Sequence, residues 1–151
     1  MYGSGYIPTA ERRAEVVWNG DLQQGSGTFD LASSGAWSGS GVSFATRTEN
    51  PDGNTSPEEL IAAAHASCYA MALSNVFSEQ SNEPEELRIN ATCVLDIGNL
   101  KISTETLDVS GRVPGLDEEG FRSAAEEAEQ ACPVSNALRH NVDIQLNVSL
   151  S

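Results

Sequence analysis

The sequence is short of positive charge. Its 151 residues contain 8 lysine and arginine residues against 22 aspartate and glutamate residues, and Lys101 is the single lysine, so the formal net charge is −14. A surface this acidic repels phosphate backbones and anionic lipid heads, which argues against nucleic-acid and membrane-surface partners. Long apolar runs are also scarce, and no stretch approaches the roughly 20 apolar residues of a membrane-spanning helix.

Export signals and disulfide patterns are missing too. The first 13 residues hold no apolar core followed by a cleavage site, so the sequence predicts a cytoplasmic protein. Its three cysteines, Cys68, Cys93 and Cys132, are an odd number, which argues against a structural disulfide framework. The length suits one domain over residues 1–151.

The apolar patterns predict an α+β fold. Alternation predicts strands near residues 14–18, 42–47, 89–97, 101–113 and 142–150. Ser56 as N-cap, Pro57 at the first helical position and Glu59 three residues after the cap predict a helix running to about residue 77. A second helix is expected over residues 117–131 and a short third one after Cys132. This order favours antiparallel sheets packed around central helices.

Helical spacing also predicts which faces are buried. In the first helix, five residues fall near one face: Leu60, Ala64, Cys68, Met71 and Val76. The middle of this helix consists mostly of small residues, which would let another element approach closely. In the second helix, Phe121, Ala124, Ala125 and Ala128 lie on one side.

Each cysteine has its own interpretation. Cys93 is in phase with the apolar residues of its strand, as expected of a small buried side chain. Cys132 precedes Pro133 at a helix N-terminus, where backbone N–H groups lower a thiol pKa, although a packed inert thiol fits equally well. Cys68 is either a core cysteine or a reactive one activated by a cation from elsewhere. Arg47 is a candidate for that cation, the alternative being an ordinary surface arginine.

A metal site is disfavoured. His65 and Cys68 are three residues apart on the predicted helix, and Cys132 and His140 would complete a set of four ligands. However, neither pair has the spacing of a zinc finger. The sequence therefore predicts no bound metal, and it contains no glycine-rich loop of the kind that binds a phosphate cofactor.

Two strings resemble a known family. Residues 55–68, TSPEELIAAAHASC, and residues 131–138, ACPVSNAL, are similar to the two cysteine motifs of the OsmC/Ohr family, the osmotically inducible and organic hydroperoxide resistance proteins. The resemblance extends from the first strand to the last. The AAHASC form, with Arg47 shortly before the helix, is more similar to the OsmC branch than to the Ohr branch.

The resemblance implies a thiol-dependent peroxidase. Cys68 would attack an organic hydroperoxide and become a sulfenic acid, and Cys132 would resolve it as a disulfide. An external dithiol, which the family implies to be of dihydrolipoyl type, would reduce that disulfide without a bound cofactor. Arg47 matches the family arginine that stabilises the thiolate, and Glu58 matches the glutamate that orients the arginine. A redox-sensing or binding module of the same fold is the alternative.

The spacing of Glu58 and Cys68 predicts a composite site. Ten residues separate them on one helix, which is about 15 Å along the axis and roughly 80° around it. Glu58 therefore cannot serve the Cys68 of its own chain unless the helix is broken. Because the family forms intertwined dimers, we expect a homodimer in which Arg47 and Glu58 come from the other subunit.

Overall fold

The computed structural model describes residues 8–151. Chain contacts divide it into two compact units, one ending at Ser56 and the other spanning Pro57–Ser151, which are described separately below. The prediction that the N-terminus carries no export signal rests in part on residues 1–7, which lie outside the described residues.

The first unit is a small antiparallel sheet with one short helix. Strands β1 (Glu15–Asn19), β2 (Ser26–Asp30) and β3 (Ser40–Val42) pair in the order β1-β2-β3. Gly27 of β2 lies under the Trp18 ring, where a Cβ atom would come within 2.8 Å of the ring. Phe29 is buried and meets Trp37 edge-on with ring centroids 6.2 Å apart. Since all of β1 is exposed, this unit buries little apolar surface within its own described residues.

Helix α1 (Phe44–Thr48) corrects the strand predicted over residues 42–47. Only Val42 of that range belongs to a strand, and Arg47 lies in the last turn of α1. Ser43 starts the helix because its side chain accepts the Thr46 backbone N–H, while the Thr46 hydroxyl accepts the Ser43 backbone N–H. This capping box stabilises a helical turn more strongly than the period-two pattern favours a strand.

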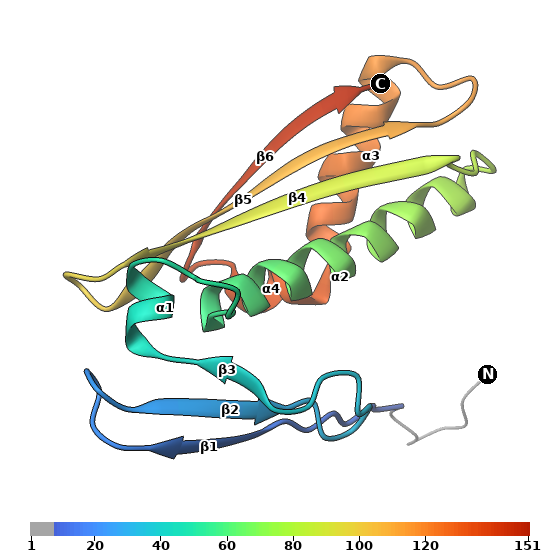
Figure 1. Cartoon of the computed structure of the whole chain (residues 1–151). Helices are drawn as coiled ribbons and strands as arrows, with labels where there is room; N and C mark the ends of the chain where they lie inside the picture. Colours follow the sequence, from blue (N-terminus) through green and yellow to red (C-terminus); the bar gives the residue numbers. More distant parts are fainter. Residues whose placement is uncertain (1–7) are drawn as a thin grey trace. The chain divides into compact units, whose positions relative to one another are not determined.

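The second unit places helices on one face of a three-stranded sheet (Figure 1). In chain order it consists of α2 (Pro57–Glu79), β4 (Glu86–Asp96), β5 (Lys101–Arg112), α3 (Glu118–Ala131), α4 (Pro133–Leu138) and β6 (Asp143–Leu150). The strand order is β4-β5-β6. Helix α2 packs against β4, and α3 packs against β6 and α2. The predicted helices and strands of this unit are thus confirmed.

The pairing of β6 differs from the antiparallel arrangement expected from sequence. Strand β4 pairs with β5 as an antiparallel hairpin, but β6 joins β5 in parallel, with Leu107 opposite Leu146. Parallel neighbours need a long crossover connection. Helices α3 and α4 supply that crossover, and it brings Cys132, at the junction of these helices, onto the helical face of the sheet.

The core lies between α2, α3 and the sheet. Phe77 and Phe121 stack with ring centroids 5.6 Å apart, and the predicted face of α3 is confirmed, because Phe121, Ala124, Ala125 and Ala128 are fully buried. Burying one large apolar side chain contributes about 1.5–3 kcal/mol. The predicted face of α2 is correct only in part: Val76 is buried and Cys68 is half-buried, but Met71 is 71% exposed. The fully buried face runs instead through Tyr69, Leu73 and Phe77. Apolar residues surround α2, so spacing alone could not select its buried face.

Helix α2 ends two residues beyond its predicted end near residue 77, and it is more apolar than expected of a chain without any membrane-span candidate. By length and composition it could cross a membrane. That is weak evidence, because the core helix of a water-soluble protein meets the same criterion. Here the helix packs along β4 and contributes Tyr69, Leu73, Val76 and Phe77 to the core.

Candidate functional site

Two cysteines meet in the second unit. Cys68 lies in the middle of α2 and is half-buried, while Cys132 is fully buried at the point where α3 ends and α4 begins. Cys68 packs against the core cluster that contains Cys132, and the two thiols are close enough for Cys132 to shift the pKa of Cys68. The structure therefore brings together the two cysteines that sequence reasoning selected, although 64 positions separate 68 from 132.

The environment of Cys68 favours the protonated thiol within its own chain. Burial raises its pKa above the ordinary value, and the neighbouring Cys132 raises the pKa further. A hydrogen bond from the Val134 backbone N–H acts in the opposite direction and lowers it. Helix α2 itself carries no lysine or arginine. A reactive thiolate at Cys68 therefore needs a cation from another segment.

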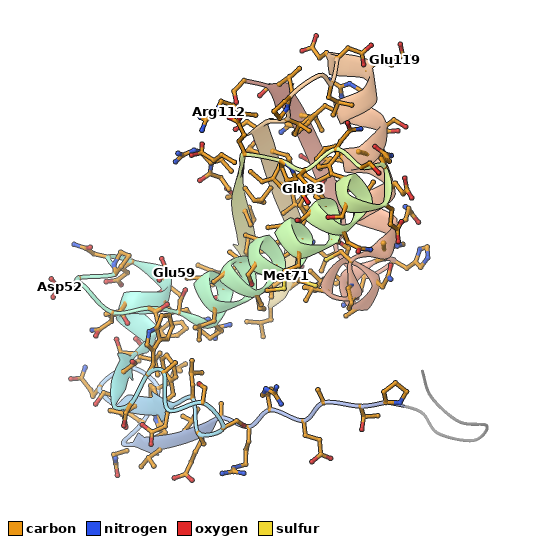
Figure 2. The ribbon with its side chains drawn as sticks, turned by 90° about the vertical axis from the view of Figure 1, so that its right-hand side faces the viewer. Asp52, Glu59, Met71, Glu83, Arg112 and Glu119 are labelled. Carbon is orange, nitrogen blue, oxygen red and sulfur yellow. The ribbon has the colours of Figure 1, made fainter. Side chains whose placement is uncertain are left out.

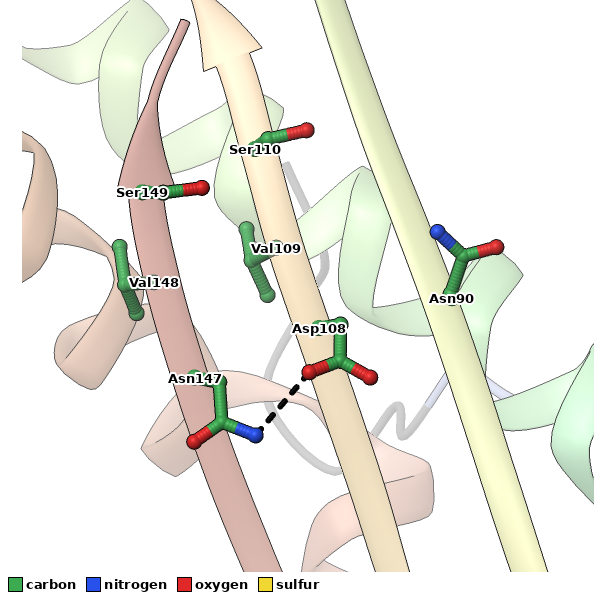
Figure 3. A pocket seen from close by; sticks show the side chains of 7 residues that line it. All are labelled: Asn90, Asp108, Val109, Ser110, Asn147, Val148 and Ser149. Carbon is green, nitrogen blue, oxygen red and sulfur yellow. Dashed lines mark hydrogen bonds between the residues drawn. The ribbon is translucent and has the colours of Figure 1, made fainter.

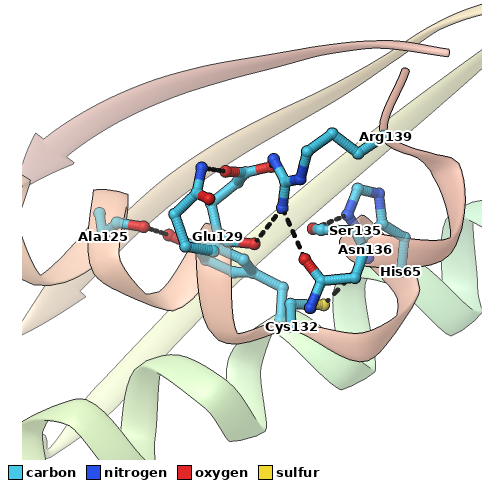
Figure 4. Close-up of polar contacts among 9 residues, drawn as sticks. His65, Ala125, Glu129, Cys132, Ser135, Asn136 and Arg139 are labelled. Atoms are coloured by element: carbon cyan, nitrogen blue, oxygen red, sulfur yellow. Dashed lines mark hydrogen bonds and ion pairs between the residues drawn. The ribbon is translucent and has the colours of Figure 1, made fainter. Parts of the chain in front are cut away.

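Helix α4 holds Cys132 in place. The Cys132 side chain is the N-cap of this helix, and its sulfur accepts the Ser135 backbone N–H at 3.5 Å. At the other end of α4, Arg139 pairs with the Glu129 carboxylate of α3 and donates to the Asn136 side chain at 2.8 Å (Figure 4). These contacts fix the corner between α3 and α4, which carries the thiol.

A network of three buried polar side chains lies beside the two cysteines. His65, one turn before Cys68 on α2, places Nε2 2.7 Å from the Ser135 hydroxyl (Figure 4). Its Nδ1 lies 3.3 Å from a carboxylate oxygen of Glu105 on β5. All three side chains are fully buried. From the sequence, His65 was a candidate metal ligand, and neither Ser135 nor Glu105 was a candidate, although Glu105 alternates in phase with the buried Leu107 and Val109.

Cys93 occupies a different environment from the dithiol. It pairs with Glu105 in the β4–β5 register, and burial together with the Glu105 carboxylate raises its pKa to about 12. Glu58 contributes a smaller part of that shift. A thiol with so high a pKa stays protonated near neutrality and is a poor nucleophile, in keeping with its prediction as a structural residue.

Arg47 and Glu58 belong to different units. Arg47 lies on α1 in the first unit, and Glu58 lies buried in the first turn of α2 in the second unit. Because α2 is continuous from Pro57 to Glu79, Glu58 is about 15 Å from Cys68 along the helix axis. Within the second unit, Glu58 acts on Cys93.

Other candidate sites are weak. Among residues 8–151, no group of three or more histidine, cysteine, aspartate or glutamate side chains is arranged to hold a metal ion. A shallow depression of about 190 Å³ lies on the sheet, lined by Asn90, Asp108, Ser110, Asn147 and Ser149, with Asn147 donating to Asp108 at 3.0 Å (Figure 3). Val109 and Val148 complete the lining, which includes neither cysteine of the dithiol.

Comparisons with known proteins agree with this geometry. Residues 50–147 match the family model described as OsmC-like protein. Over 138 residues the chain is 34% identical to peroxiredoxin OsmC of Escherichia coli, covering 90% of this chain and 95% of the relative. It is 31% identical over 97 residues to the organic hydroperoxide resistance protein of Xanthomonas axonopodis, covering 63% of this chain and 67% of that protein.

Solved structures share the fold. The organic hydroperoxide resistance protein OhrB of Bacillus subtilis superposes with a TM-score of 0.66 at 28% identity, covering 91% of this chain and 98% of that one. An OsmC-like protein of Mycoplasma pneumoniae reaches 0.72 at 16% identity, covering 93% of this chain and 97% of its own, which supports the fold alone. The names of the relatives support a role of the peroxidase type.

Proposed function

This chain belongs to the OsmC-like family, and on that basis we propose that it is a thiol-dependent peroxidase acting on organic hydroperoxides. The observation that carries the proposal is the contact between Cys68 and Cys132. A peroxidase of this type needs one thiol to attack the peroxide and a second close enough to form a disulfide with it. Relatives named peroxiredoxin OsmC and organic hydroperoxide resistance protein add support.

The proposed cycle has three balanced steps. The Cys68 thiol, reacting as its thiolate, attacks the terminal peroxide oxygen and releases the alcohol, so that Cys68–SH and ROOH give Cys68–SOH and ROH. Cys132–SH then displaces water from the sulfenic acid and forms the Cys68–Cys132 disulfide. An external dithiol, which we propose to be of dihydrolipoyl type, reduces the disulfide and is itself oxidised. The cycle requires no bound cofactor or metal.

We propose that a second copy of the chain completes the site. Cys68 needs a cation because burial raises its pKa, and α2 supplies neither lysine nor arginine. Arg47 from the partner would favour the thiolate, and Glu58 of the same partner would orient Arg47. The separation of about 15 Å between Glu58 and Cys68 on one unbroken helix supports this arrangement.

The exposed surface of α2 also favours a partner. Met71 projects from the open side of the helix (Figure 2) and is 71% exposed. Ala63, Ala64 and Ser67 are exposed on the preceding turns, so small side chains would let a second helix approach closely. Exposed apolar side chains on β1 provide further surface that a homodimer would cover.

The decisive experiment is hydroperoxide consumption by purified protein with a dithiol present. We expect Cys68→Ser to abolish turnover of cumene hydroperoxide, whereas Cys93→Ser retains nearly all of it because its thiol stays protonated. Peroxide loss is followed directly, and circular dichroism establishes that both variants are folded. If both folded variants are inactive, the assignment of roles to Cys68 and Cys93 is wrong.

Cys132 has a separate signature. In Cys132→Ser the sulfenic acid on Cys68 has no resolving thiol, so excess peroxide should convert it to sulfinic acid. Peptide mass spectrometry would detect a gain of two oxygen atoms on the Cys68 peptide. In the wild-type protein the same treatment should give a Cys68–Cys132 disulfide within one chain. Sulfinic acid at equal yield in both proteins would contradict a resolving role for Cys132.

A redox-sensing module is the second candidate. The raised pKa of Cys68 within its own chain favours it, because a mostly protonated thiol reacts slowly with peroxide. A sensor would form the same disulfide stoichiometrically but would not turn over many equivalents of hydroperoxide. Steady-state turnover with saturating dithiol separates the two functions.

A further inference from the structure

The cycle described above assigns no role to the buried polar network formed by Glu105, His65 and Ser135. Its members come from β5, α2 and α4, and all three side chains are fully buried. Neither carboxylate oxygen of Glu105 accepts a hydrogen bond of ordinary geometry within the described residues, although His65 Nδ1 lies 3.3 Å away. A buried carboxylate is costly unless it is paired. Because apolar residues in place of a buried ion pair are often as stabilising or more so, this arrangement needs a reason.

Hydrolysis is not that reason. A serine, a histidine and a carboxylate in this order resemble the triad of a serine hydrolase. A hydrolase, however, must expose its serine hydroxyl to a substrate carbonyl. Ser135 is fully buried, and its hydroxyl is held by His65 at 2.7 Å inside the unit.

The polar network of Glu105, His65 and Ser135 extends to the two thiols rather than to a substrate site. The Ser135 backbone N–H donates to the Cys132 sulfur at 3.5 Å, and the backbone N–H of the adjacent Val134 faces the Cys68 sulfur closely enough to lower the pKa of Cys68. Two consecutive peptide groups of α4 therefore contact both cysteines. The Ser135 side chain ties the same turn of α4 to His65 on α2, one helical turn from Cys68. Whatever moves Ser135 moves the contacts of both sulfurs.

We propose that Glu105, His65 and Ser135 are positioning residues for disulfide formation between Cys68 and Cys132. This inference rests on the proposed function. Glu105 fixes the orientation of the imidazole by facing Nδ1, which leaves Nε2 directed at the Ser135 hydroxyl. His65 then holds the first turn of α4 against α2. In the step that these residues govern, the Cys68–Cys132 disulfide forms and the S–O bond of the sulfenic acid breaks. The sulfenic hydroxyl leaves as water with the proton of the Cys132 thiol.

Ser135→Ala tests the proposal, with Ser78→Ala as a matched control, since Ser78 is an exposed serine near the end of α2. The equilibrium between the dithiol and glutathione disulfide measures the effective concentration of one thiol at the other. Because loss of positioning by about an ångström lowers intramolecular rates up to 100-fold, we expect Ser135→Ala to lower this concentration about tenfold. The control should match the wild-type protein.

The reaction itself gives a second measurement. After one equivalent of cumene hydroperoxide, Ser135→Ala should form the disulfide about tenfold more slowly than wild type, consistent with the same loss of positioning. More Cys68 should then reach sulfinic acid in excess peroxide, whereas the initial attack on peroxide should change far less. A merely structural defect would slow both steps together.

Two substitutions of His65 separate its two contacts. In Gln the side-chain amide extends to the place of Nε2, and in Asn it extends to the place of Nδ1. We expect His65→Gln to keep part of the wild-type effective concentration because it still reaches Ser135, and His65→Asn to lose as much as Ser135→Ala. If Ser135→Ala does not fold, this pair alone decides the question.

The outcomes are distinguishable from failure of the proposed function. Equilibrium with glutathione uses no hydroperoxide, so it reports positioning even if the wild-type protein fails to consume hydroperoxide. If Ser135→Ala and both His65 variants keep the wild-type effective concentration and the wild-type rate of disulfide formation, the positioning role is overturned.

Discussion

At the scale of the residue, the chain places the same functional group in two environments. Cys93 faces the Glu105 carboxylate, whereas Cys68 faces another thiol and a backbone N–H. A carboxylate opposes ionisation of a thiol, while an N–H donor favours the thiolate. Residue type alone therefore cannot tell the two cysteines apart, and it is the neighbours that separate them.

Cys93 should be nearly inert to alkylation in the folded protein. With a pKa of about 12, only about one Cys93 in 10,000 is a thiolate at pH 8, against roughly a quarter for an ordinary thiol of pKa about 8.5. We expect iodoacetamide to label Cys93 at least 100 times more slowly in native protein than in urea, measured by peptide mass spectrometry. Since ionisation increases tenfold per pH unit below the pKa, the native rate should rise steadily from pH 8 to about pH 11. Equal labelling in both states would refute the raised pKa.

At the scale of the element, helix ends were the most predictable features. The residues around Ser56 and Pro57 placed the start of α2, and Asp117 stands one residue before α3. Helix α1 was missed because its capping box uses Thr46 in place of the usual glutamate or glutamine, inside a run that also alternates like a strand. Where a local hydrogen bond and an apolar period disagree over five or six residues, the period carries little weight.

Asp117→Ala tests the contribution of such a cap. The Asp117 side chain accepts the Gly120 backbone N–H at 2.8 Å, so its removal leaves a helix donor without its cap. We expect the free energy of unfolding to fall by about 1 kcal/mol, measured by urea denaturation. Asp117→Asn should lose much less because the amide oxygen still accepts. Since Cys132 lies at the opposite end of α3, the rate of Cys68 oxidation should not change in either variant.

At the scale of the whole molecule, the two cysteine motifs located the thiols but not the polar network around them. His65 and Glu105 meet because α2 packs on the β4–β5 hairpin, and Ser135 joins them through helix α4 of the β5–β6 crossover. Glu105 alternates in phase with the buried Leu107 and Val109, but nothing in the local sequence indicated that its carboxylate would meet a histidine 40 positions earlier. Long-range polar contacts of this kind depend on the complete topology, which short motifs do not encode.

The composite site makes a prediction about mixed molecules. If Arg47 of one subunit serves Cys68 of the other, Cys68→Ser and Arg47→Ala should each be inactive alone, because one lacks the nucleophile and the other lacks the cation that favours the thiolate. After subunit exchange, one of the two sites in a mixed dimer contains both wild-type groups. We therefore expect about half of the wild-type activity per mixed dimer, measured by hydroperoxide consumption, with exchange followed by native mass spectrometry. Mixing Cys68→Ser with the double variant Cys68→Ser/Arg47→Ala is the control and should remain inactive. If mixed dimers form and no activity returns, Arg47 acts on the Cys68 of its own chain.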